Sequence, residues 1–95
     1  MEVLRMMYPY ITLDDGTELV HSEMLADHTV KVYIEKPDEN DGFHYASCFL
    51  PGYRWEDVSG FSTEEISGFQ TIIENNAHLI WELSQNGGFD HAAGF

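Results

Sequence analysis

The stretch Gly60–Gly88, GFSTEEISGFQTIIENNAHLIWELSQNGG, decides the fold of this chain. Ser62 occupies the N-cap position of a helix, and Glu65 three residues later completes a capping box. Gly87 and Gly88 are typical of a helix C-terminus, because glycine adopts the left-handed conformation there without a steric penalty. The stretch therefore predicts one helix over residues 62–86.

One side of this predicted helix is apolar. Small or apolar residues recur there at helical spacing, which indicates a face that must be covered. The stripe consists of Ile66, Phe69, Ile73, Ala77, Ile80 and Ser84, widened by Ile72, Leu79 and Leu83. Asn76 falls within the same sector, where a buried amide needs hydrogen-bond partners from the sheet or from another chain.

Extended segments in the first half of the chain are the candidates for that cover. An Asp-Gly turn separates two apolar runs, which is a hairpin signal, and the next run alternates strictly between apolar and polar residues. The expected strands are Tyr8–Leu13, Thr17–Leu25, Thr29–Glu35, Phe43–Leu50 and Tyr53–Val58, with a loop at Pro37–Gly42. The predicted fold class is α+β: an antiparallel β-meander of about four to five strands packed against one long C-terminal helix.

Length and composition predict one small soluble domain. The 95 residues match the size of a single domain over residues 1–95, with residues 1–7 and 89–95 expected to fray. The chain has one cysteine, Cys48, and no apolar run of the length of a signal peptide or membrane span. These features predict a cytoplasmic protein.

The charge is unusual for so short a chain. Seventeen acidic residues against four basic ones give a formal net charge of −13. Such a field repels nucleic acids and anionic membranes, and too few lysines and arginines are present to neutralise phosphates. The composition excludes direct nucleic-acid binding and favours another protein as the partner, including a basic one; it leaves a homodimer open.

The segment from Gly60 to Trp81, with its Gly-Phe-Ser-x-x-Glu-Ile start and the positions Ile72, Ile73 and Asn75, resembles a family of small bacterial proteins of unknown function. Some members of that family are encoded near toxin–antitoxin genes. The resemblance implies a β-meander followed by a helix and no established activity. The family's strand usually carries a His-x-His pair, of which only His44 is present here.

Two polar groupings have metal-ligand character. Glu74, His78 and Glu82 lie four residues apart, which places a carboxylate, an imidazole and a carboxylate on one helix face. A solvated polar face is the better interpretation, because a transition-metal site usually needs three or four converging ligands. The loop Asp38–Gly42 has the oxygen ligands that calcium prefers but lacks the spacing of a calcium loop, so we expect an acidic turn.

No catalytic motif is visible, and no cofactor is expected. Cys48 with His21, His28 or His44 has the residue types of a nucleophile and base, but no motif places them together. A lone cysteine on a strand is more often buried and inert. Four aromatic residues are candidates for an exposed, partner-binding sheet face: Tyr33, Tyr45, Tyr53 and Trp55.

These observations favour a non-enzymatic protein-interaction module of the antitoxin, immunity or inhibitor type. The alternatives are a metal-assisted enzyme that uses Glu74, His78 and Glu82, and a protein that mimics DNA through an array of carboxylates. A small-ligand binder under the helix is a further alternative, limited by the core volume of a 95-residue chain.

Overall fold

The computed structural model describes residues 7–86. They form five strands followed by one helix, which confirms the predicted fold class. The elements are β1 (Met7–Thr12), β2 (Glu18–Ser22), β3 (Val30–Asp38), β4 (Gly42–Leu50), β5 (Arg54–Ser59) and α1 (Thr63–Asn86). The expected fraying of residues 1–7 is wrong for Met7, which begins β1. The expected helix end at Gly87 and Gly88, the rest of that N-terminal range and residues 89–95 lie outside the described residues.

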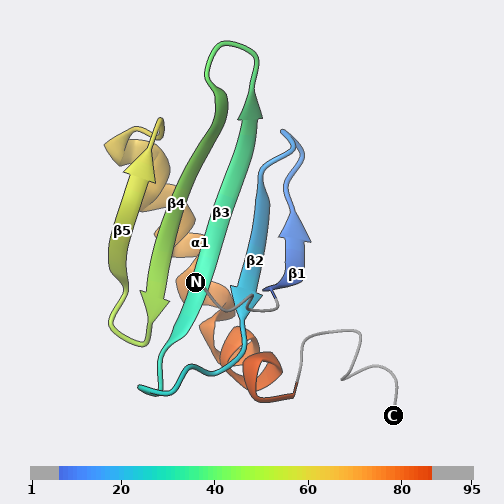
Figure 1. The fold of residues 1–95 in the computed structure, drawn as a ribbon, viewed down its shortest axis with the longest axis vertical. Coiled ribbons are helices and arrows are strands. Elements are labelled where there is room, and N and C mark those ends of the chain that lie inside the picture. The colour runs from blue at the N-terminus through green and yellow to red at the C-terminus, as the bar shows by residue number, and fades with distance from the viewer. Residues whose placement is uncertain (1–6, 87–95) are drawn as a thin grey trace, which may run out of the picture.

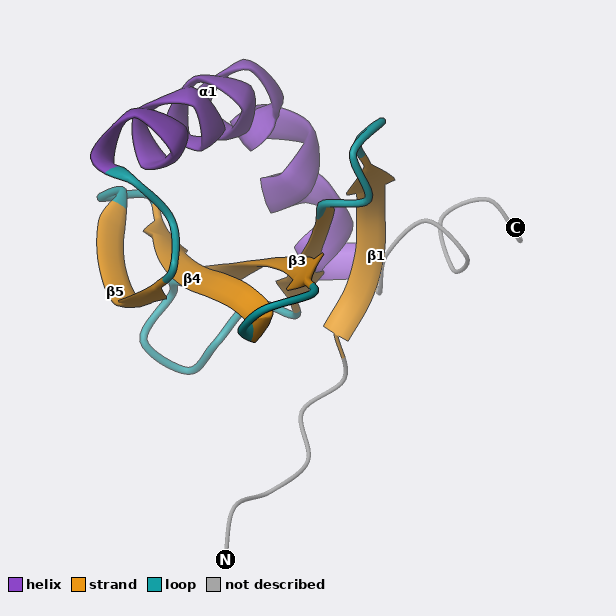
Figure 2. Ribbon diagram, turned by 90° about the horizontal axis from the view of Figure 1, so that it is seen from above, coloured by secondary structure: helices purple, strands orange, loops and turns teal. Residues whose placement is uncertain are grey.

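The five strands form one antiparallel sheet in the order β1-β2-β3-β4-β5, so each strand pairs with its neighbours in the sequence. The helix α1 lies across one face of the sheet (Figure 1). Figure 2 shows that the sheet curves around the helix, with β1 and β5 on either side of it. The other face of the sheet is convex, and no described element covers it.

The hydrophobic core lies between α1 and the concave face of the sheet. Strand β3 contributes Val30, Val32 and Ile34, all at most 1% exposed, because alternate side chains of a strand point to the same face. From α1, Ile73 and Ile80 are equally buried. Most of the predicted stripe is therefore confirmed. Leu79 is the exception: it lies on the solvent side of the helix and is 39% exposed.

The start of α1 follows the predicted capping box. The Ser62 hydroxyl accepts a hydrogen bond from the Glu65 amide over 3.1 Å, and the Glu65 carboxylate accepts one from the Ser62 amide over 2.8 Å. These bonds satisfy two backbone donors that a helix N-terminus otherwise leaves without partners. The capping box thus fixes the point where the chain leaves β5 and turns onto the sheet.

Asn76 has its hydrogen-bond partners within the fold. Its side-chain oxygen accepts a hydrogen bond from the Tyr10 hydroxyl of β1 over 2.7 Å, and its amide donates to the Ile72 carbonyl. The amide in the apolar stripe therefore ties the helix to an edge strand of the sheet.

Two strand bounds differ by more than one residue from those expected. Strand β3 continues through Pro37 to Asp38, because the β3–β4 pairing extends as far as Asp38 opposite Gly42. Pro37 is tolerated there because β2 pairs with β3 only up to Glu35, beyond which β3 is an edge strand. Strand β2 is shorter than expected and ends at Ser22.

Candidate functional site

The convex face of the sheet, called here the open face, is the candidate functional site. Three rows of residues paired across neighbouring strands form it, since directly opposed residues share a face. The cationic row is Lys31, Phe49 and Arg54. The central row is Val20, Tyr33, Ser47 and Glu56. The acidic row is Glu18, Glu35, Tyr45 and Ser59.

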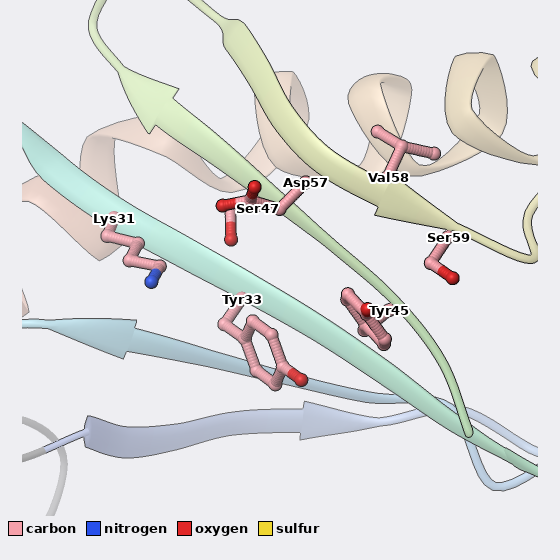
Figure 3. Close-up of a pocket in the computed structure, with 7 residues that line it drawn as sticks. All are labelled: Lys31, Tyr33, Tyr45, Ser47, Asp57, Val58 and Ser59. Carbon is pink, nitrogen blue, oxygen red and sulfur yellow. The ribbon is translucent and has the colours of Figure 1, made fainter. Parts of the chain in front are cut away.

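Figure 3 shows Lys31, Tyr33 and Tyr45 on the side of the sheet turned away from α1. They line a shallow hollow of about 490 Å³ together with Ser47, Asp57, Val58 and Ser59. Tyr45 is 39% exposed, and Phe43 beyond it on the same strand face is 52% exposed. Exposed aromatic rings of this kind are what protein interfaces use as anchors.

Both cations of this face lie near aromatic rings. The Arg54 guanidinium lies 4.6 Å from the Phe49 ring centroid, and its Nε donates to a Glu56 carboxylate oxygen over 2.6 Å. The Lys31 Nζ lies 5.9 Å from the Tyr33 ring centroid. Partial burial, with Glu35 as a second cause, raises the pKa of the Tyr33 phenol, which is therefore neutral at pH 7. Tyr33 therefore offers an apolar ring and a neutral hydroxyl.

Tyr53 and Trp55 do not belong to the open face, so the expectation that four aromatic residues share one exposed face is wrong for these two. The pairing of Arg54 with Phe49 puts Trp55 opposite Cys48 on the helix side. The Trp55 indole nitrogen donates to Gln70 of α1 over 2.9 Å. Both aromatic residues pack against the core, and Tyr33 and Tyr45 remain as the candidates.

Glu74, His78 and Glu82 are not brought together as a metal site among residues 7–86. The Glu74 carboxylate accepts a hydrogen bond from Gln70 over 3.1 Å, and all three residues are exposed on α1. The one group of described residues whose ligand atoms come within 4.8 Å of one another is Asp38, Asp41 and His44 at the β3–β4 hairpin.

This hairpin group is explained by its local structure. One Asp38 oxygen accepts the amides of Asn40 and Asp41, each over 3.0 Å, which forms the expected acidic turn and lowers the pKa of Asp38. The His44 Nε2 lies 3.3 Å from Asp41 and 3.8 Å from Asp38. No local pattern in the sequence links the loop to His44; only the register of the β3–β4 hairpin brings them together.

Cys48 is fully buried and has the character of a core residue. Burial raises the pKa of its thiol to about 11, so the nucleophilic thiolate is not formed at neutral pH. His44 lies four residues away on the same strand, His21 lies two strands away on β2, and His28 lies in the β2–β3 turn. The sheet therefore does not assemble a cysteine–histidine pair from these residues.

A smaller hollow of about 210 Å³ lies where the β4–β5 turn meets the helix. Its lining consists of Leu50, Pro51, Tyr53, Ala77, His78 and Trp81. A hollow of this size is below the volume of typical small-molecule sites. This hollow therefore gives little support to the alternative that the protein binds a small ligand under the helix.

His21 lies with Leu19 on the inner face of β2 and is fully buried. Its Nδ1 lies 2.9 Å from the Ser22 carbonyl, to which it donates, whereas its buried Nε2 has no hydrogen-bond partner among the described residues. The ring packs beside Tyr8 and Tyr10, at centroid distances of 5.6 and 6.4 Å. Burial lowers the pKa of His21 below its usual 6.5, because a second proton would have no acceptor.

We expect the free energy of unfolding to fall as the pH is lowered from about 6.5 towards 5, since the unfolded chain then binds a proton that folded His21 does not. His21→Phe should flatten this pH dependence, measured by urea denaturation at several pH values. His78→Gln, which changes an exposed histidine, is the control and should keep the dependence of the natural chain. An unchanged pH dependence in His21→Phe would contradict the assignment of this loss of stability to His21.

Comparison with family models, with curated proteins and with solved structures finds no match for this chain. The resemblance of residues 60–81 to a family of small bacterial proteins stays a prediction. Within residues 7–86, α1 is not apolar enough over a sufficient length to cross a membrane.

Proposed function

We propose that this protein is a non-enzymatic protein-interaction module that binds its partner through the open face. The observation that carries the proposal is that α1 covers only one face of the sheet, while the other presents Tyr33, Tyr45 and Phe43 without a described cover. Neighbouring aromatic residues on an otherwise charged surface are typical of docking sites.

The edges of the sheet are poorly suited to binding a further strand. This favours the open face over a sheet edge as the surface that binds the partner. Strand β1 contains Pro9, which has no amide hydrogen, and its pairing with β2 shifts register between Pro9 and Ile11. The pairing of β5 with β4 shifts between Tyr45 and Ser47, where Asp57 adopts a positive φ of 56°. Irregularities of this kind disfavour edge-to-edge association.

The charge on the rest of the surface favours basic proteins over nucleic acids as partners. The solvent-facing side of α1 carries no lysine or arginine. Its acidic residues are Glu64, Glu65, Glu74 and Glu82. A surface of one sign steers partners of the opposite sign and repels those of like sign. A role as an antitoxin, immunity protein or inhibitor is consistent with this field.

The experiment is affinity capture with the tagged full chain and two variants. The double substitution Tyr33→Ser/Tyr45→Ser removes the rings of the open face and should abolish capture of any stoichiometric partner. Leu79→Ser removes a side chain that is as exposed as Tyr45 from the opposite side of the molecule and should leave capture unchanged. Equal capture by both variants, with both folded by circular dichroism, would contradict the proposal.

A further inference from the structure

We infer that the protein bound by the open face is a second copy of this chain, packed sheet to sheet with its strands antiparallel. The inference rests on the proposed function, because it names the partner of the same surface. Two observations favour a second copy: the low net charge of this face and the separation of its charges into two ends.

The open face carries only a small part of the negative charge of this strongly acidic molecule. Its three rows and its hollow contain two basic residues, Lys31 and Arg54, and four acidic ones, Glu18, Glu35, Glu56 and Asp57, which gives +2 − 4 = −2. The whole chain carries −13. Two identical acidic chains repel each other least where the local charge is smallest, and Debye screening reduces the repulsion between their distant charges.

The two ends of the open face differ in sign. In the acidic row, Glu18 and Glu35 stand directly opposite each other on β2 and β3, and neither has an ion pair within residues 7–86. Like charges that are directly opposed across strands destabilise a sheet. Four residues from Glu35 along β3, about 13 Å away, Lys31 points from the same face, also without a described ion pair.

A two-fold axis that lies between the two sheets, perpendicular to the strands and at the level of Tyr33, would set the cationic end of each copy against the acidic end of the other. It would place β3 over β3 of the partner with reversed direction, so that each Lys31 meets the Glu18 and Glu35 carboxylates of the other copy. Because the face is convex, β3 and β4 would form the centre of the contact, where Tyr33 and Tyr45 lie. A two-fold interface requires self-complementarity of this kind.

The test is a charge exchange followed by sedimentation velocity. The natural chain should form a dimer. Lys31→Glu and Glu35→Lys should each weaken the dimer about tenfold or more, because both symmetric contacts then oppose like charges. An equimolar mixture of these two variants should dimerise again, since the contacts between positions 31 and 35 then each join a carboxylate of one copy to an ammonium group of the other. The control is Lys36→Glu, which makes the same charge change as Lys31→Glu but on the other face of β3.

Lys36 pairs with Asp15 on that other face of the sheet over 3.3 Å, so Lys36→Glu should leave the dimer intact. A natural chain that is monomeric at all concentrations would overturn the inference that the partner is a second copy. If Tyr33→Ser/Tyr45→Ser still lost a captured protein in that case, the proposed function would stand with a different partner. A dimer that neither charge variant weakens would place the contact elsewhere and would also overturn the inference.

Discussion

Replacing Ile73 with alanine is expected to lower the free energy of unfolding by about 2–5 kcal/mol, the usual cost of removing a large aliphatic side chain from a packed core. Ile73 is fully buried in the middle of α1 and belongs to the same core cluster as Val32 and Ile34 of β3. The free energy of unfolding falls for two reasons: less apolar surface is buried on folding, and the substitution leaves a cavity that the curved sheet can fill only partly. Urea denaturation followed by tryptophan fluorescence measures it.

Leu79→Ala on the same helix is the matched control. It removes a side chain of the same size from the solvent side, where the Leu79 residue is 39% exposed, and should change the free energy of unfolding by less than about 0.5 kcal/mol. Similar losses for the two variants would mean that α1 does not use the Ile73 side to cover the sheet.

Gly60→Ala is expected to destabilise the fold by about 2–4 kcal/mol, for two separate reasons. Gly60 joins β5 to α1 with a φ of 89°, a conformation that residues with a Cβ rarely adopt. A Cβ there would also collide with the His44 ring, whose Cγ would lie only 2.5 Å away. His44 has little room to move, because its ring packs edge-on against Phe61 at a centroid distance of 5.6 Å.

A double-mutant cycle separates the two causes. In a His44→Ala background the collision is absent, so Gly60→Ala should cost only the backbone part, about 1–2 kcal/mol. Gly68→Ala is the control for the substitution itself: Gly68 lies within α1 with open space around it, and alanine there should stabilise the helix by about 0.5–1 kcal/mol. An equal cost of Gly60→Ala with and without His44 would exclude the collision.

The sequence allowed the helix and most of the core to be predicted because their signals are local. The capping box of Ser62 and Glu65 needs only four consecutive residues, and the alternation of Val30, Val32 and Ile34 needs only one strand. Leu79 was assigned wrongly because helical spacing places it at the rim of the stripe, where the reach of the sheet decides its burial.

The candidate site was harder to predict because it depends on pairing between strands. Whether Trp55 faces the helix or solvent is decided by the register that sets Arg54 opposite Phe49; a shift of one residue would turn every side chain of β5 to the other face. The acidic pair of Glu18 and Glu35 likewise exists only in the observed β2–β3 register. No property of either segment alone contains this information.

The order of the elements has a consequence for biosynthesis. Because every strand pairs with its neighbour in the sequence, hairpins can form one after another as the polypeptide leaves the ribosome. The segment that shields Val32 and Ile34, however, begins only at Thr63 and is made after all five strands. Translation that stalls before this point would release a sheet whose concave apolar face is uncovered, a species prone to aggregate and a natural client for chaperones.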